Sequence, residues 1–194
     1  MICNWIKRLF GRRSGATPAP ASPNSASASK PNSTVAPKTY DERRVSTPNK
    51  TKNCIRPEAI ILHHSSGSYL GGCAWIASPE SKVSYHVLIA RDGRRTVFAD
   101  DTDRCWHAGV SSWQGHSDLN SWSLGVSWEG DTYTQPLGED AMDSAIEYIV
   151  PRMRKWRIPL DKVLTHQQVS PNRKNDISPA DAVRFKARLK EALV

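Results

Sequence analysis

The chain has 194 residues, enough for one sizeable domain with a tail, and its formal net charge is +8. Residues 1–53 hold ten Lys and Arg against two Asp and Glu, whereas residues 54–194 hold seventeen of each. A region without net basic charge does not favour nucleic-acid binding, so we expect no nucleic-acid partner. No apolar run in the sequence approaches the roughly 18 residues of a membrane-spanning helix.

The first 13 residues combine basic side chains with apolar side chains at helical spacing. The apolar residues recur at i, i+3, i+4, i+7 and i+8 and are Ile2, Trp5, Ile6, Leu9 and Phe10. This spacing is typical of a short amphipathic helix that lies on an anionic membrane surface. An irregular start of the chain explains the same residues equally well, so both interpretations stay open for residues 1–13.

Residues 14–53 are dominated by Ser, Pro, Ala, Asn and Lys and have almost no large apolar side chains. Such a segment cannot bury enough apolar surface to offset the entropy lost on ordering, so we expect a disordered linker. At Cys54 the composition changes to apolar runs, aromatic residues and turn signals. The sequence therefore predicts one folded domain over residues 54–194, which we expect to be a monomer.

The cysteines and the N-terminal segment indicate the cellular compartment in which the protein is made. The four cysteines, Cys3, Cys54, Cys73 and Cys105, form no CxxC pair and are most simply reduced thiols. The N-terminal segment lacks the continuous apolar stretch of a secretory signal peptide. We therefore expect a protein that is cytoplasmic at synthesis.

Short apolar runs and turn signals predict that strands and helices alternate from Cys54 onward. The expected strands cover residues 59–64, 83–90, 94–99, 123–130 and 161–166, and the expected helices cover residues 71–78, 138–157 and 178–193. Asp92 and Gly93 form the turn of a hairpin between two of these strands. Ser178 is the expected N-cap of the last helix, with Pro179 at its first position. This alternation predicts a single α/β domain with a mixed central β-sheet flanked by helices.

Histidines and an acid at the ends of two predicted strands could form a metal site. His63 and His64 end one strand, and its pleat points them to opposite faces, so we expect only one of them to bind metal. His166 ends another strand and leads into a loop that contains Asp176. A catalytic zinc site needs three protein ligands, which His63, His166 and Asp176 would complete. On spacing alone, surface or packed core histidines explain the same residues.

Five blocks of the sequence resemble a known enzyme family. They are "ILHHSS", "VSYHVLIARDGR", "RCWHAGVSSWQG", "NSWSLGVSWEGD" and "LTHQQVSPNRKNDISPA". In this order they are similar to zinc-dependent N-acetylmuramoyl-L-alanine amidases, a superfamily shared by AmpD-type amidases, small phage amidases and peptidoglycan recognition proteins. The resemblance covers roughly residues 55–192 and implies the amidase/peptidoglycan recognition protein-like fold.

The resemblance assigns roles to the residues of the candidate metal site. It implies that His63, His166 and Asp176 bind one Zn²⁺ per chain. Lys174 matches the lysine that the family places near the metal and the developing oxyanion. Trp106 and His107 match the "WHAG" segment that lines the substrate groove of the family. For these last two residues, a packed aromatic beside a structural histidine is the alternative interpretation.

One position departs from the AmpD-type pattern. AmpD-type enzymes carry a glutamate near the metal where this chain has Ser127, and serine is no general base at neutral pH. Other branches of the family have a tyrosine at the position of Tyr85. The resemblance therefore implies Tyr85 and Lys174 as the catalytic pair. Glu129 lies on the same strand face as Ser127 and is the alternative to Tyr85.

The implied reaction is hydrolysis of the amide between N-acetylmuramic acid and L-alanine of the peptidoglycan stem peptide. A phage-type endolysin, or a related wall-lysing enzyme, is the main hypothesis, because a basic membrane-seeking segment suits an enzyme that acts on the cell wall. A cytosolic AmpD-like amidase that recycles anhydro-muropeptides is the first alternative. A peptidoglycan-binding module without catalysis is the second.

Overall fold

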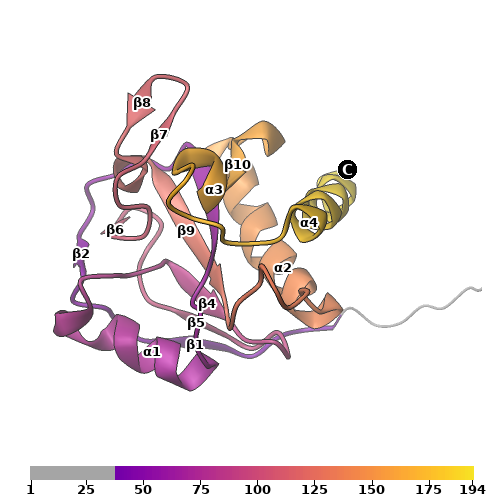
Figure 1. Cartoon of the computed structure of the whole chain (residues 1–194), viewed down its shortest axis with the longest axis horizontal. Helices are drawn as coiled ribbons and strands as arrows, with labels where there is room; N and C mark the ends of the chain where they lie inside the picture. Colours follow the sequence, from indigo (N-terminus) through magenta and orange to yellow (C-terminus); the bar gives the residue numbers. More distant parts are fainter. Residues whose placement is uncertain (1–37) are drawn as a thin grey trace, which may run out of the picture. The chain divides into compact units, whose positions relative to one another are not determined.

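Six strands form one mixed sheet in the computed structural model of the chain, which describes residues 38–194 (Figure 1). Across the sheet they are β1 (Glu42–Arg44), β5 (Arg95–Val97), β4 (Val87–Ile89), β9 (Ser123–Trp128), β3 (Ala59–His64) and β10 (Val163–Thr165). β4 and β5 are antiparallel, and the other neighbouring pairs are parallel. The predicted α/β fold with a mixed central sheet is confirmed.

Helices cover both faces of this sheet. α2 (Glu139–Trp156) and α4 (Pro179–Ala192) lie on one face, and α1 (Tyr69–Ala77) lies on the other (Figure 1). α4 begins where the sequence predicts, because the Ser178 side chain accepts a hydrogen bond from the backbone N–H three residues further on.

The central strand β3 is buried on both faces, as the continuous apolar run "AIILHH" predicts. Ile60 and Leu62 face the apolar cluster that α2 and α4 build. Ile61 and His63 point to the opposite face, where Ile61 packs against Ala108. The alternation thus places His63 on the face away from α2 and α4, at the C-terminal end of the strand.

The remaining elements are short. They are β2 (Lys50–Thr51), β6 (Arg104–Cys105), the hairpin of β7 (Ser112–Trp113) and β8 (His116–Ser117), α3 (His166–Val169), and single-turn helices at Pro79–Ser81, Leu119–Ser121 and Leu160–Lys162. Three cysteines, Cys54, Cys73 and Cys105, are free thiols. No helix within residues 38–194 is both long enough and apolar enough to span a bilayer.

The folded part of the chain begins earlier than the sequence predicts. β1 lies within the predicted linker and pairs with β5, and β2 pairs with β6. Arg95 of β5 binds Glu42 at 2.8 Å, and Lys50 binds Asp103 at 2.7 Å. The prediction of a disordered linker is therefore wrong for residues 38–53. The predicted amphipathic helix of residues 1–13 and the rest of the linker, residues 14–37, fall outside the described part.

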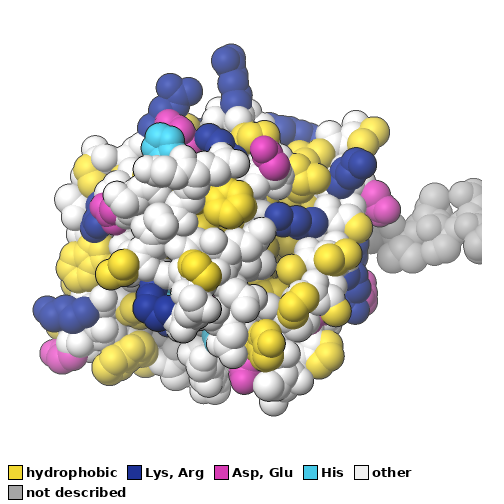
Figure 2. All heavy atoms as spheres, turned by 45° about the horizontal axis from the view of Figure 1, so that its top comes forward, with side chains coloured by type: hydrophobic (Ala, Val, Ile, Leu, Met, Phe, Trp, Pro, Cys, Tyr) yellow, Lys and Arg dark blue, Asp and Glu magenta, His cyan; other side chains and the backbone are white. Residues whose placement is uncertain are grey.

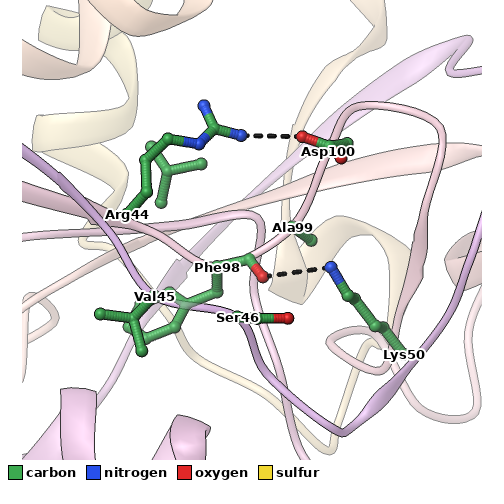
Figure 3. A pocket seen from close by; sticks show the side chains of 8 residues that line it. Arg44, Val45, Ser46, Lys50, Phe98, Ala99 and Asp100 are labelled. Atoms are coloured by element: carbon green, nitrogen blue, oxygen red, sulfur yellow. Dashed lines mark hydrogen bonds and ion pairs between the residues drawn. The ribbon is translucent and has the colours of Figure 1, made fainter.

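The linker prediction failed because it counted only apolar burial. β1 has the sequence Glu-Arg-Arg with all three residues exposed, so backbone hydrogen bonds and ion pairs attach it to the sheet. Figure 3 shows this attachment around a pocket of about 220 Å³, where Arg44 binds Asp100 and the Lys50 ammonium donates to the Phe98 carbonyl.

The earlier start also changes the division of charge. Residues 38–53 bring five basic and two acidic residues into the folded part, whose net charge becomes +3. The remaining +5 belongs to residues 1–37. On the face that Figure 2 shows, Lys and Arg side chains are interspersed with Asp and Glu rather than gathered in one patch.

Candidate active site

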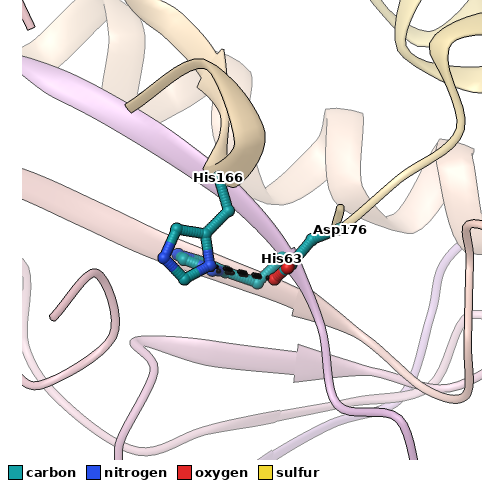
Figure 4. Close-up of side chains that lie close together, drawn as sticks. All are labelled: His63, His166 and Asp176. Carbon is teal, nitrogen blue, oxygen red and sulfur yellow. Dashed lines mark hydrogen bonds and ion pairs between the residues drawn. The ribbon is translucent and has the colours of Figure 1, made fainter. Parts of the chain in front are cut away.

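Three side chains that the sequence singles out lie together at one edge of the sheet. His63 is near the end of β3, His166 follows β10, and Asp176 lies in the loop between α3 and α4. The His63 Nδ1 atom lies 2.9 Å from His166 Nδ1, which lies 3.0 Å from Asp176 Oδ2. Figure 4 shows the three side chains turned toward one another. The parallel pairing of β3 and β10 explains this meeting, because it brings their C-terminal ends to the same edge.

His166 begins a helix, whereas the sequence predicts it as the last residue of a strand. β10 ends at Thr165, whose hydroxyl accepts a hydrogen bond from the Gln168 backbone N–H, while the Gln168 side chain accepts one from the Thr165 backbone N–H. This reciprocal cap starts α3 at the residue where the strand was expected to end, so β10 ends one residue earlier than expected. A turn at residues 171–173 then returns the chain so that Asp176 meets His166.

Hydrogen bonds on the far side of each imidazole determine which nitrogen faces the cluster. His166 Nε2 donates to the Ala108 carbonyl at 3.1 Å, which leaves a lone pair on His166 Nδ1. His107 Nε2 donates to the Ser123 carbonyl at 3.4 Å, so His107 Nδ1 is an acceptor. His63 Nε2 lies 3.0 Å from that acceptor and donates to it, which leaves a lone pair on His63 Nδ1. Both rings therefore direct a lone pair at the cluster.

The charge state of the cluster favours a cation. Burial, and then the neighbouring His166, lower the pKa of His63 to about 3, so its ring is neutral at pH 7. Although burial raises the pKa of Asp176, its contacts with His166 and His63 bring it below the usual value, so Asp176 is a carboxylate. Two nitrogen lone pairs and a carboxylate oxygen then converge, with ligand atoms within 4.8 Å of one another. Buried acceptors that face one another are unfavourable unless a cation lies between them, so this arrangement suits a metal ion.

His107 supports this cluster from behind and is not among the residues that line the pocket beside it, so its predicted contact with substrate stays a prediction. It is only 4% exposed, and its ring centroid lies 5.0 Å from that of His63. Gly125 makes room for the ring, because a Cβ atom there would lie 2.6 Å from His107 Cγ. The alternative interpretation, a structural histidine, agrees with this placement. Trp106 is half-buried, and its contact with substrate stays a prediction.

A pocket of about 210 Å³ opens beside the candidate metal ligands. Its lining includes Asp176 together with Lys174 and Tyr85, the two predicted catalytic residues. The Tyr85 ring centroid lies 5.1 Å from that of His63. Burial, and then the Asp176 carboxylate, raise the pKa of Tyr85, so its phenol keeps its proton at neutral pH. The pocket thus presents one cation and one neutral proton donor next to the cluster.

Glu129, the alternative to Tyr85, is hydrogen-bonded to the backbone of two other segments. Its two carboxylate oxygens accept hydrogen bonds from the backbone N–H groups of Tyr69 and Arg91, each at 3.0 Å. These bonds join the first turn of α1 to the chain that follows β4. Both oxygens are therefore occupied by the scaffold, and Tyr85 is the residue of the two that lines the pocket.

Two further pocket residues escaped the sequence prediction. Trp75 on α1 lines the pocket and is 56% exposed. His64 also lines it, with Nδ1 accepting a hydrogen bond from the Thr132 backbone N–H at 3.1 Å. The pleat of β3 does turn His64 away from the metal cluster, as predicted. The helix that carries Trp75 was predicted. The sequence of such a nine-residue helix does not show which of its faces meets a pocket, so Trp75 was not recognised as a pocket residue.

Comparison with known proteins agrees with this geometry. Residues 53–179, which contain all three candidate ligands and both catalytic candidates, match the family described as N-acetylmuramoyl-L-alanine amidase. The chain belongs to this amidase family. The match begins one residue before the predicted domain start at Cys54 and after the strands β1 and β2.

Relatives of known name lie within the same family. The 1,6-anhydro-N-acetylmuramyl-L-alanine amidase AmpD of Haemophilus influenzae is 37% identical over 98 residues, which cover 50% of this chain and 53% of that protein. The chain spans about half the length of the curated relatives it matches.

Solved structures share the fold. A crystal structure of AmpD has a TM-score of 0.67 at 26% identity, covering 77% of this chain and 95% of that one. The Escherichia coli amidase AmiD, solved with the substrate anhydro-N-acetylmuramic acid-L-Ala-D-gamma-Glu-L-Lys, has a TM-score of 0.64 at 21% identity. The match with AmiD covers 70% of this chain and 58% of that one, and at this identity it shows the fold alone.

Proposed function

We propose that this protein is a zinc-dependent N-acetylmuramoyl-L-alanine amidase. The reaction would cleave the amide between the lactyl group of N-acetylmuramic acid and L-alanine of the stem peptide. The observation that carries the proposal is the convergence of three possible metal-ligand side chains, His63, His166 and Asp176, beside a pocket that holds Lys174 and Tyr85. Membership of the amidase family, and the names of the relatives, support the same reaction.

Zinc fits the donor set. Two neutral imidazoles and one carboxylate are a known ligand set of catalytic zinc sites, which keep a fourth position open. Tetrahedral zinc holds its ligand atoms about 3.3 Å apart, and the three pairs here are separated by 2.9, 3.0 and 3.4 Å. When bound, such an ion lowers the pKa of water to about 7 and polarises a carbonyl group.

The pocket residues would supply the rest of the chemistry. The Lys174 ammonium would stabilise the negative charge that develops on the carbonyl oxygen as water adds to the carbon. Tyr85 would donate its proton to the nitrogen as the C–N bond breaks, and would recover a proton from the added water. The overall change is then amide plus water to carboxylate and protonated amine. An amide needs both contributions, because its carbonyl is a poor electrophile and its nitrogen a poor leaving group.

Product analysis on defined variants tests this function. We expect wild-type protein to release a free L-alanyl stem peptide, detected by mass spectrometry. Asp176→Ala should lower both zinc content and turnover, whereas Lys174→Ala should retain zinc and lower kcat by about 10²-fold or more. A zinc-free preparation with full activity would end the zinc proposal. Binding of peptidoglycan without any cleavage would identify a non-catalytic binding module instead.

Two versions of this proposal differ in the form of the substrate, which is either intact wall or soluble fragments. The basic segment of residues 1–37 supports a wall-lysing enzyme of the endolysin type, made in the cytoplasm and acting on intact wall. Similarity to AmpD supports a recycling amidase that acts on soluble anhydro-muropeptides. We place the wall-lysing enzyme first, since a recycling enzyme gains nothing from a basic tail. Turnover of intact sacculi and of soluble anhydro-muropeptides, measured side by side, distinguishes the two.

A further inference from the structure

Ser127 is a buried polar residue whose hydroxyl has no partner. It lies in β9 with 0% of its surface exposed, and within residues 38–194 its Oγ makes no hydrogen bond. Buried polar atoms in native proteins are nearly always hydrogen-bonded, because leaving them unpaired costs stability. An unpaired hydroxyl at this position therefore indicates a function that the static hydrogen-bond network does not include.

The register of the sheet places this hydroxyl in the active site. β9 runs parallel to β3, and Ser127 is directly opposite His63, so the two side chains point to the same face. Tyr85 reaches the same place from the segment before β4, with its ring against that of His63. In agreement with this placement, the Ser127 hydroxyl lowers the pKa of the Tyr85 phenol, against the larger opposite effect of burial. Ser127 and Tyr85 therefore both flank His63 on the face of the sheet that carries the candidate ligands.

This inference rests on the proposed amidase function. We propose that Ser127 is a positioning residue whose hydroxyl donates a hydrogen bond to the Tyr85 phenol oxygen and so turns the Tyr85 O–H into the pocket. A phenol hydroxyl otherwise rotates between two in-plane directions, and this hydrogen bond would select one of them. Because the Ser127 oxygen is closed off from solvent, it acts on the substrate only through Tyr85.

The kinetics of a double-mutant cycle test this function. With an N-acetylmuramoyl-L-alanyl peptide as substrate, Ser127→Ala should lower kcat about tenfold and leave KM and zinc content unchanged. In a Tyr85→Phe background the same substitution should cost nothing further, because the group that it positions is gone. Ser127→Thr keeps a hydroxyl and should recover most of the activity. Ser144→Ala, which changes a buried serine on α2, is the matched control and should match wild type.

The outcomes separate this inference from the proposed function. An equal loss from Ser127→Ala in the wild-type and Tyr85→Phe backgrounds would show a structural role and overturn the inference. So would full activity of Ser127→Ala. A wild-type protein that releases no stem peptide would overturn the amidase proposal itself. Independently of activity, a high-resolution crystal structure should show the two hydroxyl oxygens within about 3.2 Å, and a Ser127 hydroxyl bonded to backbone instead would contradict the proposal.

Discussion

His107 lies behind the candidate metal ligands and holds the ring of His63 in place. Its Nδ1 accepts from His63 Nε2, and this bond keeps the lone pair of His63 Nδ1 directed at Asp176 and His166. Without the acceptor, the His63 ring would be free to change tautomer and to rotate. The buried support of a ligand is therefore as much a part of the site as the ligand itself.

We predict that His107→Ala lowers the affinity for zinc by about 10- to 100-fold, because outer partners of metal-binding histidines typically contribute that much. Competition with a chromophoric chelator measures the affinity directly. His116→Ala removes an exposed histidine in the β7–β8 hairpin and serves as the control, with affinity equal to wild type. Unchanged affinity in His107→Ala would mean that packing alone orients His63.

Residue spacing predicted the three candidate ligands but not their support. His63 and His166 each end an apolar run that reads as a strand, and the resemblance to the amidase family joined them with Asp176 in one site. His107 lies in an irregular segment between β6 and β7, and its burial depends on the absence of a side chain at Gly125. The contact between His107 and Gly125 joins residues eighteen positions apart. It leaves no repeating pattern in the sequence, so the sequence alone did not reveal it.

Among the elements, those with an apolar face were predicted and those without one were not. α2 and α4 bury side chains at a period of 3.6, and β3 and β9 are short segments buried on both faces, so their sequences carry these signals. β1 consists of three exposed charged residues and belongs to the sheet through its backbone. Backbone pairing leaves no trace in side-chain composition, so this strand could be found only in the structure.

Glu129 joins two elements, and its removal should affect stability rather than chemistry. In Glu129→Gln, one amide oxygen replaces two carboxylate oxygens, so one of the N–H groups of Tyr69 and Arg91 loses its partner. We expect the free energy of unfolding to fall by about 1–2 kcal/mol, with kcat at saturating substrate within about twofold of wild type. Urea unfolding and steady-state kinetics on the same samples measure both. A stable but inactive variant would restore Glu129 as a catalytic candidate.

His86 links three segments of the fold and makes their assembly sensitive to acid. Its Nδ1 accepts from the Gly125 N–H and its Nε2 donates to the Asp103 carbonyl, both of which require a neutral ring. Burial lowers the pKa of His86 from 6.5 to about 4. Between these values the unfolded chain binds a proton that the folded chain does not. Stability is therefore complete above pH 6.5 and declines as the pH falls toward 4, by up to about 1.4 kcal/mol per pH unit from this group.

His86→Gln tests this dependence, because glutamine also offers one acceptor and one donor but does not titrate. We expect the variant to be less stable at pH 7 and to lose stability less steeply than wild type between pH 6.5 and 4.5. Urea unfolding at several pH values gives both slopes, and the contributions of the other histidines cancel in the comparison. Parallel slopes would mean that His86 is protonated in the folded protein over this range.

At the scale of the whole molecule, most of the net positive charge belongs to residues 1–37, which precede the described part of the chain. Residues 1–37 carry five basic residues and no acidic one, and residues 2–10 place apolar side chains on one predicted helical stripe. Each basic residue near an anionic leaflet contributes about 1 kcal/mol, and the effect fades within a Debye length of about 10 Å at 0.1 M salt. Attachment to a membrane through this segment would therefore be reversible and sensitive to salt.

We predict that full-length protein sediments with anionic vesicles at low salt and is released at high salt. A chain that starts at residue 38 should remain in the supernatant and hydrolyse soluble substrate at the wild-type rate, because it keeps every described element. The same chain should be weaker in lysis of whole cells. Equal sedimentation of the two proteins would show that the apolar stripe of residues 2–10 is an accident of composition.

The position of β1 has a consequence for where the chain can be cut. A boundary drawn at residue 53, where the family match begins, would remove β1 and turn β5 from an inner strand into an outer one. The N–H and C=O groups of Arg95–Val97 would then be open for pairing with a second molecule, and the Arg95 guanidinium would lose Glu42 and keep Glu147. The shorter chain should self-associate with rising concentration in analytical ultracentrifugation, while the chain that starts at residue 38 stays monomeric. The three charged residues of β1 would thus keep β5 from pairing with a second molecule.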